Sequence, residues 1–187
     1  MRVIAGRYRG RILDTVRDHS VRPATGRVRQ TVFDMLTHRK DFEGIAILDL
    51  FAGSGSLGIE SLSRGAGHAV FVESDQRAAA IIEKNVRTLQ CEHSTEIRTM
   101  DALRFVAADS RQFDIVFADP PYVYAQTHAI PSLVFSSGRV KRDGYLIIEH
   151  ARGQQFDDTP GCAAGPARAF GRTVVTFFTS TSQPVQP

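Results

Sequence analysis

The hydrophobic positions of the first forty residues predict a hairpin and then a helix. In RVIAGRYRGRIL, two apolar runs flank a basic turn that contains glycine, and this pattern is typical of a short β-hairpin. In RPATGRVRQTVFDMLTHRK, Thr25 can cap a helix whose apolar residues from Val28 to Leu36 recur on one face. We expect this helix to run from about Gly26 to Arg39.

From Ala46 onward, short β-branched runs alternate with segments of helical periodicity. Five strands are predicted, at AILDLF, HAVFVES, STEIRT, FDIVFAD and GYLIIEH. The helices or turns between them are predicted at LGIESLSRGA, QRAAAIIEKNVRTLQ, ALRFVAAD and around HAIPSLVFSS. Because strand and helix repeat without interruption, we expect right-handed crossovers and a parallel sheet with helices on both faces.

The last part of the chain predicts a closing antiparallel pair on the sheet edge. The segments ARAFG and TVVTFFT are separated by a Gly-Arg pair, and STSQPVQP is expected to be frayed. The prediction is an α/β fold with a mostly parallel seven-stranded sheet and an antiparallel closing strand. Its parts are a basic hairpin and helix over residues 1–40, the α/β domain over residues 41–180 and a tail over residues 181–187.

Composition narrows the classes of protein. With 187 residues, 42% of them hydrophobic, the chain can bury one core. The apolar runs are strand-sized and MRVIAGRYRGR lacks the apolar region of a signal peptide, so we expect neither membrane insertion nor secretion but a cytoplasmic protein. Cys91 and Cys162 lie far apart and the six histidines are scattered, so neither a disulfide framework nor a metal site is expected.

Basic residues are concentrated at the start of the chain. Residues 1–40 contain ten Lys and Arg against three Asp and Glu, whereas residues 41–187 contain thirteen against seventeen. This asymmetry is expected of a protein that grips phosphates with one end, although a solvated arginine-rich surface explains it equally. Arg27 and Arg29 fall in the first turn of the predicted helix, where the helix dipole disfavours cations. The candidates for phosphate contact are Arg7, Arg9, Arg11, Arg22, Arg27 and Arg29.

A glycine-rich turn follows the first strand of the α/β domain. In DLFAGSGSLG, Gly53, Gly55 and Gly58 fit the pattern G-x-G-x-x-G between a strand and a helix, which is the context of a nucleotide-cofactor site. Glu73 closes the second strand, twenty residues after Gly53, where an acid can accept both ribose hydroxyls of a nucleoside. Glycines alone could serve only close packing, but together with the acid they favour cofactor binding.

Asp49, just before this turn, bears on which cofactor fits. A carboxylate there would lie close to the place where a dinucleotide lays its pyrophosphate, and that juxtaposition is repulsive. The same carboxylate is favourable near an ammonium or a sulfonium, and S-adenosylmethionine carries both without a phosphate. Asp101, just past the third strand, can accept a hydrogen bond from an adenine amino group with the backbone of Ala102 beside it, unless it serves only as a helix N-cap.

The run RQFDIVFADPPY ends a buried strand in a rigid polar corner. Pro120 and Pro121 cannot continue a central strand, so the backbone must leave the sheet after Asp119 in an extended shape. Tyr122 follows directly. A simple tight turn does not need this combination of acid, prolines and tyrosine, so we expect the corner to hold a ligand.

These motifs carry a family resemblance. DLFAGSGSLGIESLSRGA, VFVESD and FDIVFADPPY, in this order and spacing, resemble motifs of the class I S-adenosylmethionine-dependent methyltransferases, and DPPY resembles the branch that methylates exocyclic amino nitrogens. Together with RVIAGRYRGR and RPATGRVRQTVFDML, the chain resembles the bacterial RsmD family from about residue 2 to residue 149. That family makes N2-methylguanine in small-subunit ribosomal RNA. It usually reads RPTT with an acid after the second arginine, where this chain has Ala24 and Gln30.

The resemblance implies a Rossmann-like class I methyltransferase fold and S-adenosylmethionine as cofactor. The guanine amine is a poor nucleophile, and the Asp119 carboxylate and the Pro120 carbonyl can each accept one of its N–H groups, while Tyr122 can stack on a base swung out of its helix. The implied catalytic residues are Asp119, Pro120, Pro121 and Tyr122. The implied cofactor-binding residues are Asp49, Phe51, Ala52, Gly53, Ser54, Gly55, Glu73, Asp101, Ala102 and Asp119. Tyr122 and the six arginines named above complete the expected substrate-binding set.

The resemblance also implies a target, the N2 amine of a guanine in 16S ribosomal RNA, as at position 966. The partner would be the 30S subunit or an assembly intermediate, and the enzyme a monomer without metal. Methylation at a pyrimidine carbon is disfavoured, because neither cysteine lies near a strand end with a nucleophile motif. Three alternatives stay open: an amino-methyltransferase of DNA adenine or another RNA, a nicotinamide-dependent dehydrogenase, and a non-catalytic RNA-binding module.

Overall fold

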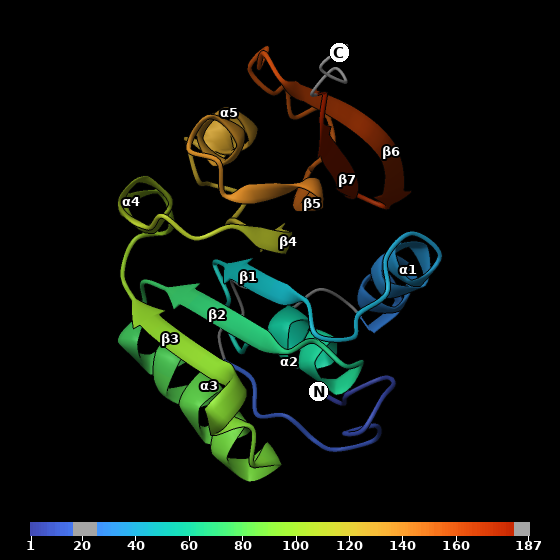
Figure 1. Cartoon of the computed structure of the whole chain (residues 1–187), viewed down its shortest axis with the longest axis vertical. Coiled ribbons are helices and arrows are strands. Elements are labelled where there is room, and N and C mark those ends of the chain that lie inside the picture. Colours follow the sequence, from blue (N-terminus) through green and yellow to red (C-terminus); the bar gives the residue numbers. More distant parts are fainter. Residues whose placement is uncertain (17–25, 182–187) are drawn as a thin grey trace, which may run out of the picture. The chain divides into compact units, whose positions relative to one another are not determined.

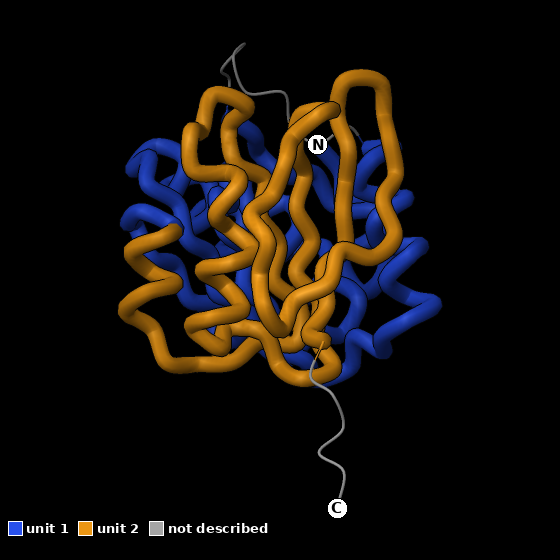
Figure 2. The backbone as a smooth tube through the Cα atoms, turned by 90° about the horizontal axis from the view of Figure 1, so that it is seen from above, with its two compact units in different colours: residues 1–102 blue, residues 103–187 orange. Residues whose placement is uncertain are grey.

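The computed structural model describes residues 1–16 and 26–181, which form two compact units (Figure 2). The first unit is Met1–Ala102 and the second is Leu103–Pro187. Thr25, the predicted cap of the first helix, lies outside the described residues, as does almost all of the predicted tail. In the described ranges, no helix combines the length and the apolarity needed to cross a membrane.

The first unit is built on a three-stranded parallel sheet with the order β3-β2-β1 (Figure 1). Leu48 of β1 pairs with Val70 of β2, and Val70 pairs with Glu96 of β3. The helices α2 and α3 connect these strands, as the sequence predicts. The elements are α1 (Gly26–Thr37), β1 (Ala46–Leu50), α2 (Ser56–Ser63), β2 (His68–Glu73), α3 (Gln76–Leu89), the short 3-10 helix η1 (Glu92–Ser94) and β3 (Thr95–Thr99).

Local chemistry explains where α3 begins and which side it buries. The side chain of Asp75 accepts hydrogen bonds from the backbone N–H groups of Arg77 at 2.6 Å and Ala78 at 3.2 Å, so it caps the helix. Ile82 and Val86 follow Ala78 at intervals of four residues and are buried. The amphipathic face of α3 therefore packs on the sheet of the first unit.

The helix α1 ends two residues earlier than predicted. The backbone N–H groups of Arg39 and Lys40 both donate to the carbonyl of Leu36, each at 2.8 Å, so the chain tightens into a turn there. Phe33 is fully buried and its ring lies 5.6 Å from that of Phe42. This contact fixes the helix within the first unit.

The predicted N-terminal hairpin is present as a short antiparallel pairing without regular strands. Only one antiparallel bridge forms in residues 1–16, between Arg2 and Ile12. Val3 donates its N–H to Arg11 at 3.0 Å and accepts that of Gly10 at 2.9 Å, and Leu13 and Met1 exchange bonds of 2.7 and 2.9 Å. Residues 6–11, here named the basic turn, connect the two sides.

Helix α2 binds backbone N–H groups on the first side of this hairpin. The Glu60 carboxylate is 1% exposed and accepts the backbone N–H of Ile4 at 2.7 Å and of Ala5 at 3.0 Å. It also accepts the Nε of Arg64 at 2.9 Å. These bonds hold the start of the chain against α2, because they satisfy backbone groups that the hairpin leaves unpaired.

The second unit contains a four-stranded mixed sheet with the order β4-β5-β7-β6 (Figure 1). The strand β5 pairs in parallel with β4 and antiparallel with β7, and β7 pairs antiparallel with β6. The predicted closing pair is therefore confirmed. The elements are α4 (Ala102–Ala108), which begins at the last residue of the first unit, then β4 (Phe113–Ala118), the 3-10 helix η2 (Thr127–Ala129), α5 (Ile130–Ser136), β5 (Val140–Ala151), β6 (Cys162–Phe170) and β7 (Thr173–Ser180).

Two strands of this unit are longer than predicted. The strand β5 begins at Val140 rather than at Gly144, and its pairing with β4 shifts in register near Phe113. The strand β6 begins at Cys162 and has its own register shift on both sides of Pro166. Proline is compatible with an edge strand at such an irregularity, because no ladder bond from its nitrogen is needed there.

Candidate active site

The glycine turn, residues 51–58, leaves β1 through a left-handed backbone. Phe51 has φ 57° and Gly53 has φ 56°, and Gly55 has φ 76° at the start of α2. Phe51 adopts this conformation although it is not glycine, and such strain clusters at ligand sites. A Cβ atom placed on Gly53 would meet no atom within 4 Å. Space beside the backbone is therefore open at the first glycine of the motif.

The third glycine of the motif has a different role. A Cβ atom on Gly58 would lie 2.3 Å from the ring of Phe71 on β2, which no real contact permits. Gly58 therefore allows α2 to pack closely on β2. The close-packing interpretation of the motif therefore holds for Gly58.

Glu73 connects the glycine turn to helix α3. One oxygen of its carboxylate accepts the backbone N–H of Gly53 at 2.8 Å, and the other accepts that of Asp75 at 2.9 Å. The side chain is half-buried. A carboxylate has about four lone-pair positions, so each oxygen keeps capacity for a further donor such as a hydroxyl.

Asp49 lies beneath the turn and is 2% exposed. Its Oδ2 accepts the backbone N–H of Gly58 at 2.9 Å. Burial raises the pKa of the Asp49 carboxyl to about 7; the Gly58 hydrogen bond lowers it, and the charge of Glu73 raises it further. The charged form of this acid is thus disfavoured unless a cation lies nearby.

Asp101 lies at the same edge of the first unit's sheet as Glu73. Thr99 at the end of β3 pairs with Glu73, and the backbone N–H of Met100 donates to the Glu73 carbonyl at 3.0 Å. Asp101 is half-buried and directly precedes α4, whose first residue, Ala102, is buried. From this position Asp101 can accept a hydrogen bond from an adenine amino group or cap helix α4, which are the two roles that the sequence leaves open.

Asn85 on α3 also supports the turn, and sequence reasoning missed it. Its Nδ2 donates to the carbonyls of Ser54 and Asp14, each at 3.0 Å, and its Oδ1 accepts the N–H of Asp14 at 2.8 Å. A buried asparagine in an otherwise amphipathic helix was the available signal. The N-terminal segment and the glycine turn are therefore joined through one amide.

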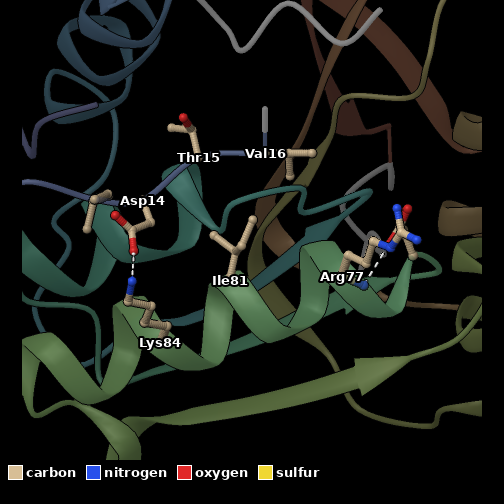
Figure 3. A pocket seen from close by; sticks show the side chains of 8 residues that line it. Asp14, Thr15, Val16, Arg77, Ile81 and Lys84 are labelled. Atoms are coloured by element: carbon tan, nitrogen blue, oxygen red, sulfur yellow. Dashed lines mark hydrogen bonds and ion pairs between the residues drawn. The ribbon is translucent and has the colours of Figure 1, made fainter. Parts of the chain in front are cut away.

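A hollow of about 680 Å³ opens beside Asp14 and helix α3 in the first unit (Figure 3). An ion pair of 2.5 Å between Lys84 and Asp14 lies at one side of it, and Arg77 and Ile81 of α3 lie along it. The residues of the glycine turn do not line it. Its link to the turn is Asp75, whose N–H donates to Glu73.

In the second unit, the D-P-P-Y corner follows β4 as predicted. Asp119 is half-buried, Pro120 is buried and Pro121 is exposed. The N–H of Tyr124 donates to the carbonyl of Pro121 at 2.8 Å, which closes a turn. Tyr122 is 60% exposed.

The exposed ring of Tyr122 is held by its hydroxyl group. That hydroxyl hydrogen-bonds the Oγ1 of Thr173, the first residue of β7. A fixed, exposed aromatic ring is suited to stack on a flat ligand. Thr173 has no motif around it, and only the fold brings it to the corner.

Four of the arginine candidates present exposed side chains, namely Arg7, Arg9, Arg11 and Arg27. The Arg7 guanidinium lies 4.6 Å from the centre of the Tyr8 ring, and Arg11 donates to the carbonyl of Thr88 at 2.9 Å. The basic turn therefore carries three of these cations on the first unit. Arg22 lies outside the described residues.

The prediction of phosphate contact for Arg29 is corrected. Arg29 is 3% exposed, donates to the carbonyl of Arg2 at 2.5 Å and contacts the sulfur of Met1. Burial lowers its pKa, against an opposing effect of the Glu60 charge. This arginine holds the start of the chain to α1, because its charged group is turned inward.

A second hollow, of about 640 Å³, lies between the basic turn and the end of α1. Its lining residues are Gly6, Thr37, His38, Arg39, Lys40, Asp41, Phe42 and Arg64. The Nη2 of Arg64 is buried there and has no hydrogen-bond partner among the described residues. Within the same residues, no cluster of three or more His, Cys, Asp or Glu side chains could hold a metal ion.

Comparison with known proteins identifies relatives along almost the whole chain. Residues 1–179 match the family described as Conserved hypothetical protein 95. YlbH of Bacillus subtilis is 37% identical over 164 residues, covering 86% of this chain and 88% of the relative. Ribosomal RNA small subunit methyltransferase D of Haemophilus influenzae is 36% identical over 155 residues, covering 80% and 78%. The solved structure of yhhF from Escherichia coli has a TM-score of 0.85 at 28% identity and covers 98% of this chain and 99% of its own.

We conclude that the chain is a methyltransferase with the Rossmann-like class I fold. This conclusion rests on these similarities together with the seven strands, the glycine turn and the D-P-P-Y corner. The chain belongs to the family described as Conserved hypothetical protein 95, which is the RsmD family. The predicted fold class and the predicted family are both confirmed.

Proposed function

We propose that this protein transfers a methyl group from S-adenosylmethionine to the exocyclic N2 amine of a guanine in 16S ribosomal RNA, as at position 966. The observation that carries the proposal is the D-P-P-Y corner at the end of β4 in a chain of this family. A relative with 36% identity is named for methylation of small-subunit ribosomal RNA, which supports the RNA substrate.

The residues of the first unit fit this cofactor. When bound, S-adenosylmethionine supplies an electrophilic methyl group on a sulfonium. The open space at Gly53 admits a ligand next to the backbone, and Glu73 keeps acceptor capacity for ribose hydroxyls. The Asp49 carboxyl, whose charge burial disfavours, would be stabilised in its charged form by an adjacent cation. Asp101 and Ala102 are proposed to hold the adenine.

The D-P-P-Y corner prepares the amine. The amine lone pair of guanine is delocalised into the ring, so the nitrogen must be held nearer to tetrahedral geometry. We assign one N–H acceptor to the Asp119 carboxylate and the other to the Pro120 carbonyl. Pro121 keeps the corner rigid, and such fixed orientation lowers the barrier mainly by positioning. Tyr122 would stack on the base after it has left its helix.

The basic turn is the proposed RNA surface. Arg7, Arg9 and Arg11 are exposed there, and Arg27 is exposed on α1. The second hollow brings further cations, Arg39 and Lys40 among them, next to Gly6 of the basic turn. Contacts of arginine and lysine with phosphates would set the position of the RNA without reading its sequence.

The decisive experiment is methyl transfer with labelled S-adenosylmethionine to separate unmethylated substrates, followed by nucleoside mass spectrometry. The substrates are naked ribosomal RNA, small subunits, an assembly intermediate, transfer RNA and duplex DNA. We expect N2-methylguanosine from ribosomal RNA or its particles, and the particle arms show whether ribosomal proteins are needed. N6-methyladenine from DNA, or methylation of transfer RNA alone, would refute the target.

The same preparation tests the other two classes of function. Binding of NADH without binding of S-adenosylhomocysteine would identify a dehydrogenase. A biological effect that persists unchanged in Asp119→Ala would identify a non-catalytic RNA-binding module. Sedimentation of the enzyme alone would test the expected monomer.

A further inference from the structure

A second acid stands next to the D-P-P-Y aspartate in the second unit. In the parallel pair β4 and β5, Ala118 is the register partner of Ile148. The next residues along the two strands are Asp119 and Glu149. Neighbouring strands lie about 4.8 Å apart, and register partners in a pair point to the same face of the sheet. The two carboxyl groups therefore leave the same edge of the sheet side by side.

Tyr122 lies on the same face of the sheet as the two acids, Asp119 and Glu149. Glu149 pairs with Val175 of β7, and Ala151 pairs with Thr173. Because side chains alternate along a strand, Thr173 points to the same face as Val175, and therefore to the face of Glu149. The Tyr122 hydroxyl hydrogen-bonds Thr173. The ring of Tyr122 is thus tied to the face on which both acids lie.

The Glu149 carboxyl group has no structural partner among the residues that the structure describes. It is half-buried, and it forms no hydrogen bond with any residue that the structure describes. Burial raises its pKa to about 7. A desolvated acid without donors destabilises the protein by itself, so a ligand with N–H donors would relieve that cost.

The neighbouring titratable group is turned away from this face. His150 is buried, and its Nε2 lies 2.8 Å from the Oγ1 of Thr176. Its ring packs against Phe156, with 4.9 Å between the centroids. Glu149 is therefore the residue of this part of β5 that the corner can use.

We propose that Glu149 reads the Watson–Crick edge of the target guanine by accepting its N1–H. This inference rests on the proposed function and deepens it. Guanine presents N1–H and the N2 amine side by side, so one acid can take the ring N–H while Asp119 takes an amine N–H. Adenine presents a lone pair at N1, which a carboxylate repels. Glu149 thus selects guanine, and Asp119 prepares the nitrogen that reacts.

The test changes the hydrogen-bonding groups of both the target base and residue 149. The substrates are small subunits reconstituted with RNA that carries either guanine or 2-aminopurine at the target position. 2-Aminopurine keeps the amine but has a bare lone pair at N1. The wild-type enzyme should prefer guanine. In Glu149→Gln the side-chain amide can donate to that lone pair, so kcat/KM should fall for guanine, on the order of tenfold to a hundredfold, and rise for 2-aminopurine.

Two further variants separate recognition from folding. Glu149→Asp keeps the charge but draws it back, so it should lose activity on guanine without gaining 2-aminopurine. Asp158→Asn removes an exposed acid of the same unit and should leave both substrates unaffected. Binding of S-adenosylhomocysteine and the unfolding midpoint verify that each variant is folded.

The outcomes distinguish a failure of the proposed function from a failure of the role of Glu149 alone. If the wild-type enzyme makes no N2-methylguanosine, the proposed function fails and this inference fails with it. If the wild type methylates guanine but Glu149→Gln keeps the wild-type ratio of guanine to 2-aminopurine, only the role of Glu149 is refuted. A reversal of that preference, absent in Asp158→Asn, is the expected result.

Discussion

Asp49 and Glu73 both accept hydrogen bonds from the backbone of the glycine turn, but they differ in contact with water. Asp49 is fully buried and has a raised pKa, whereas Glu73 is half-buried and binds two N–H groups. Burial disfavours the charge of Asp49 in the absence of a cation. The buried acid Asp49 thus makes the stability of the candidate site depend on the charge of its own carboxyl group.

For Asp49, we predict a pH-dependent loss of stability that Asp49→Asn removes. Its folded-state pKa of about 7 lies above the usual value of 3.8. Between these values the folded state keeps a proton that the unfolded state has lost, so stability falls as the pH rises from about 4 to about 7. Above that window Asp49→Asn should be more stable than wild type, on the order of 2–4 kcal/mol in the unliganded protein.

Urea unfolding at pH 4, 5.5 and 8 measures this effect as the difference between the two proteins. The difference between wild type and variant isolates Asp49 from other acids, such as Glu149, whose pKa is also raised. A difference that stays constant over this pH range would contradict the prediction.

Glu73 and Asp119 should separate cofactor binding from catalysis. Glu73→Ala loses the bonds to Gly53 and Asp75, so the affinity for S-adenosylhomocysteine should fall at least about tenfold. Asp119→Ala should keep that affinity and lower kcat by about a hundredfold or more. Calorimetry and single-turnover methylation measure the two effects. Glu83→Ala, an exposed acid on α3, is the control, and the reverse pattern would overturn both assignments.

At the scale of elements, the basic turn depends on how closely it approaches α2. A Cβ atom on Gly6 would lie 1.8 Å from the backbone oxygen of Ser63, whereas one on Gly10 would meet nothing within 4 Å. Both glycines have left-handed φ, at 79° and 82°. The same substitution at the two positions therefore separates backbone strain from a steric clash.

We predict that Gly6→Ala destabilises the protein more than Gly10→Ala does. Gly10→Ala incurs only the left-handed strain, about 1–2 kcal/mol. Gly6→Ala adds displacement of the basic turn from α2 and should at least double that loss. Urea unfolding measures the free energy of unfolding of both variants. Equal losses would show that the close approach to Ser63 does not affect stability.

The sequence predicted the regular elements and the N-terminal pairing, but not how the N-terminal segment packs, for a physical reason. Strands such as β4 are apolar apart from one residue, Asp114, so their burial can be read from composition. The sequence did not show that the predicted hairpin is held to α2 by Glu60, which is distant in sequence and binds the N–H groups of Ile4 and Ala5. A glutamate inside the run LGIESLS is its trace in the sequence, and the structure buries it to 1% exposure.

In the candidate site too, residues of local motifs are predictable from the sequence, whereas residues that join through tertiary contacts are not. The glycines, Glu73 and the D-P-P-Y corner belong to a contiguous motif or to a strand end, and the sequence identifies them. Asn85 and Thr173 enter the site only through tertiary hydrogen bonds, which no spacing in the sequence encodes. Arg29 was misassigned because its burial depends on how α1 meets the start of the chain.

At the scale of the whole molecule, the charge is divided along the chain. The first forty residues carry the whole excess of Lys and Arg, since the rest of the chain is net acidic, and the exposed cations of the basic turn belong to them. Electrostatic attraction to RNA should therefore depend on this segment more than on the net charge of +3. Salt dependence of binding is the direct measure of that attraction.

We predict that the double variant Arg7→Ala, Arg9→Ala weakens RNA binding and flattens its dependence on salt. Each lost phosphate contact should reduce the slope of log K against log salt by roughly 0.7–0.9. The matched control is the double variant Arg142→Ala, Arg168→Ala, which removes two exposed arginines of the second unit. Fluorescence anisotropy with a ribosomal RNA fragment measures both. An equal change in the control would show that only total charge matters.

The two-sided nature of β5 has a consequence for large-scale mutagenesis. Ile148 and His150 face the interior of the second unit, while Glu149 between them faces the corner. A library that scores cellular abundance and methyl transfer separately should therefore distinguish position 149 from its two neighbours. Changes at Ile148 and His150 should deplete the protein itself, whereas changes at position 149 should leave it plentiful and inactive.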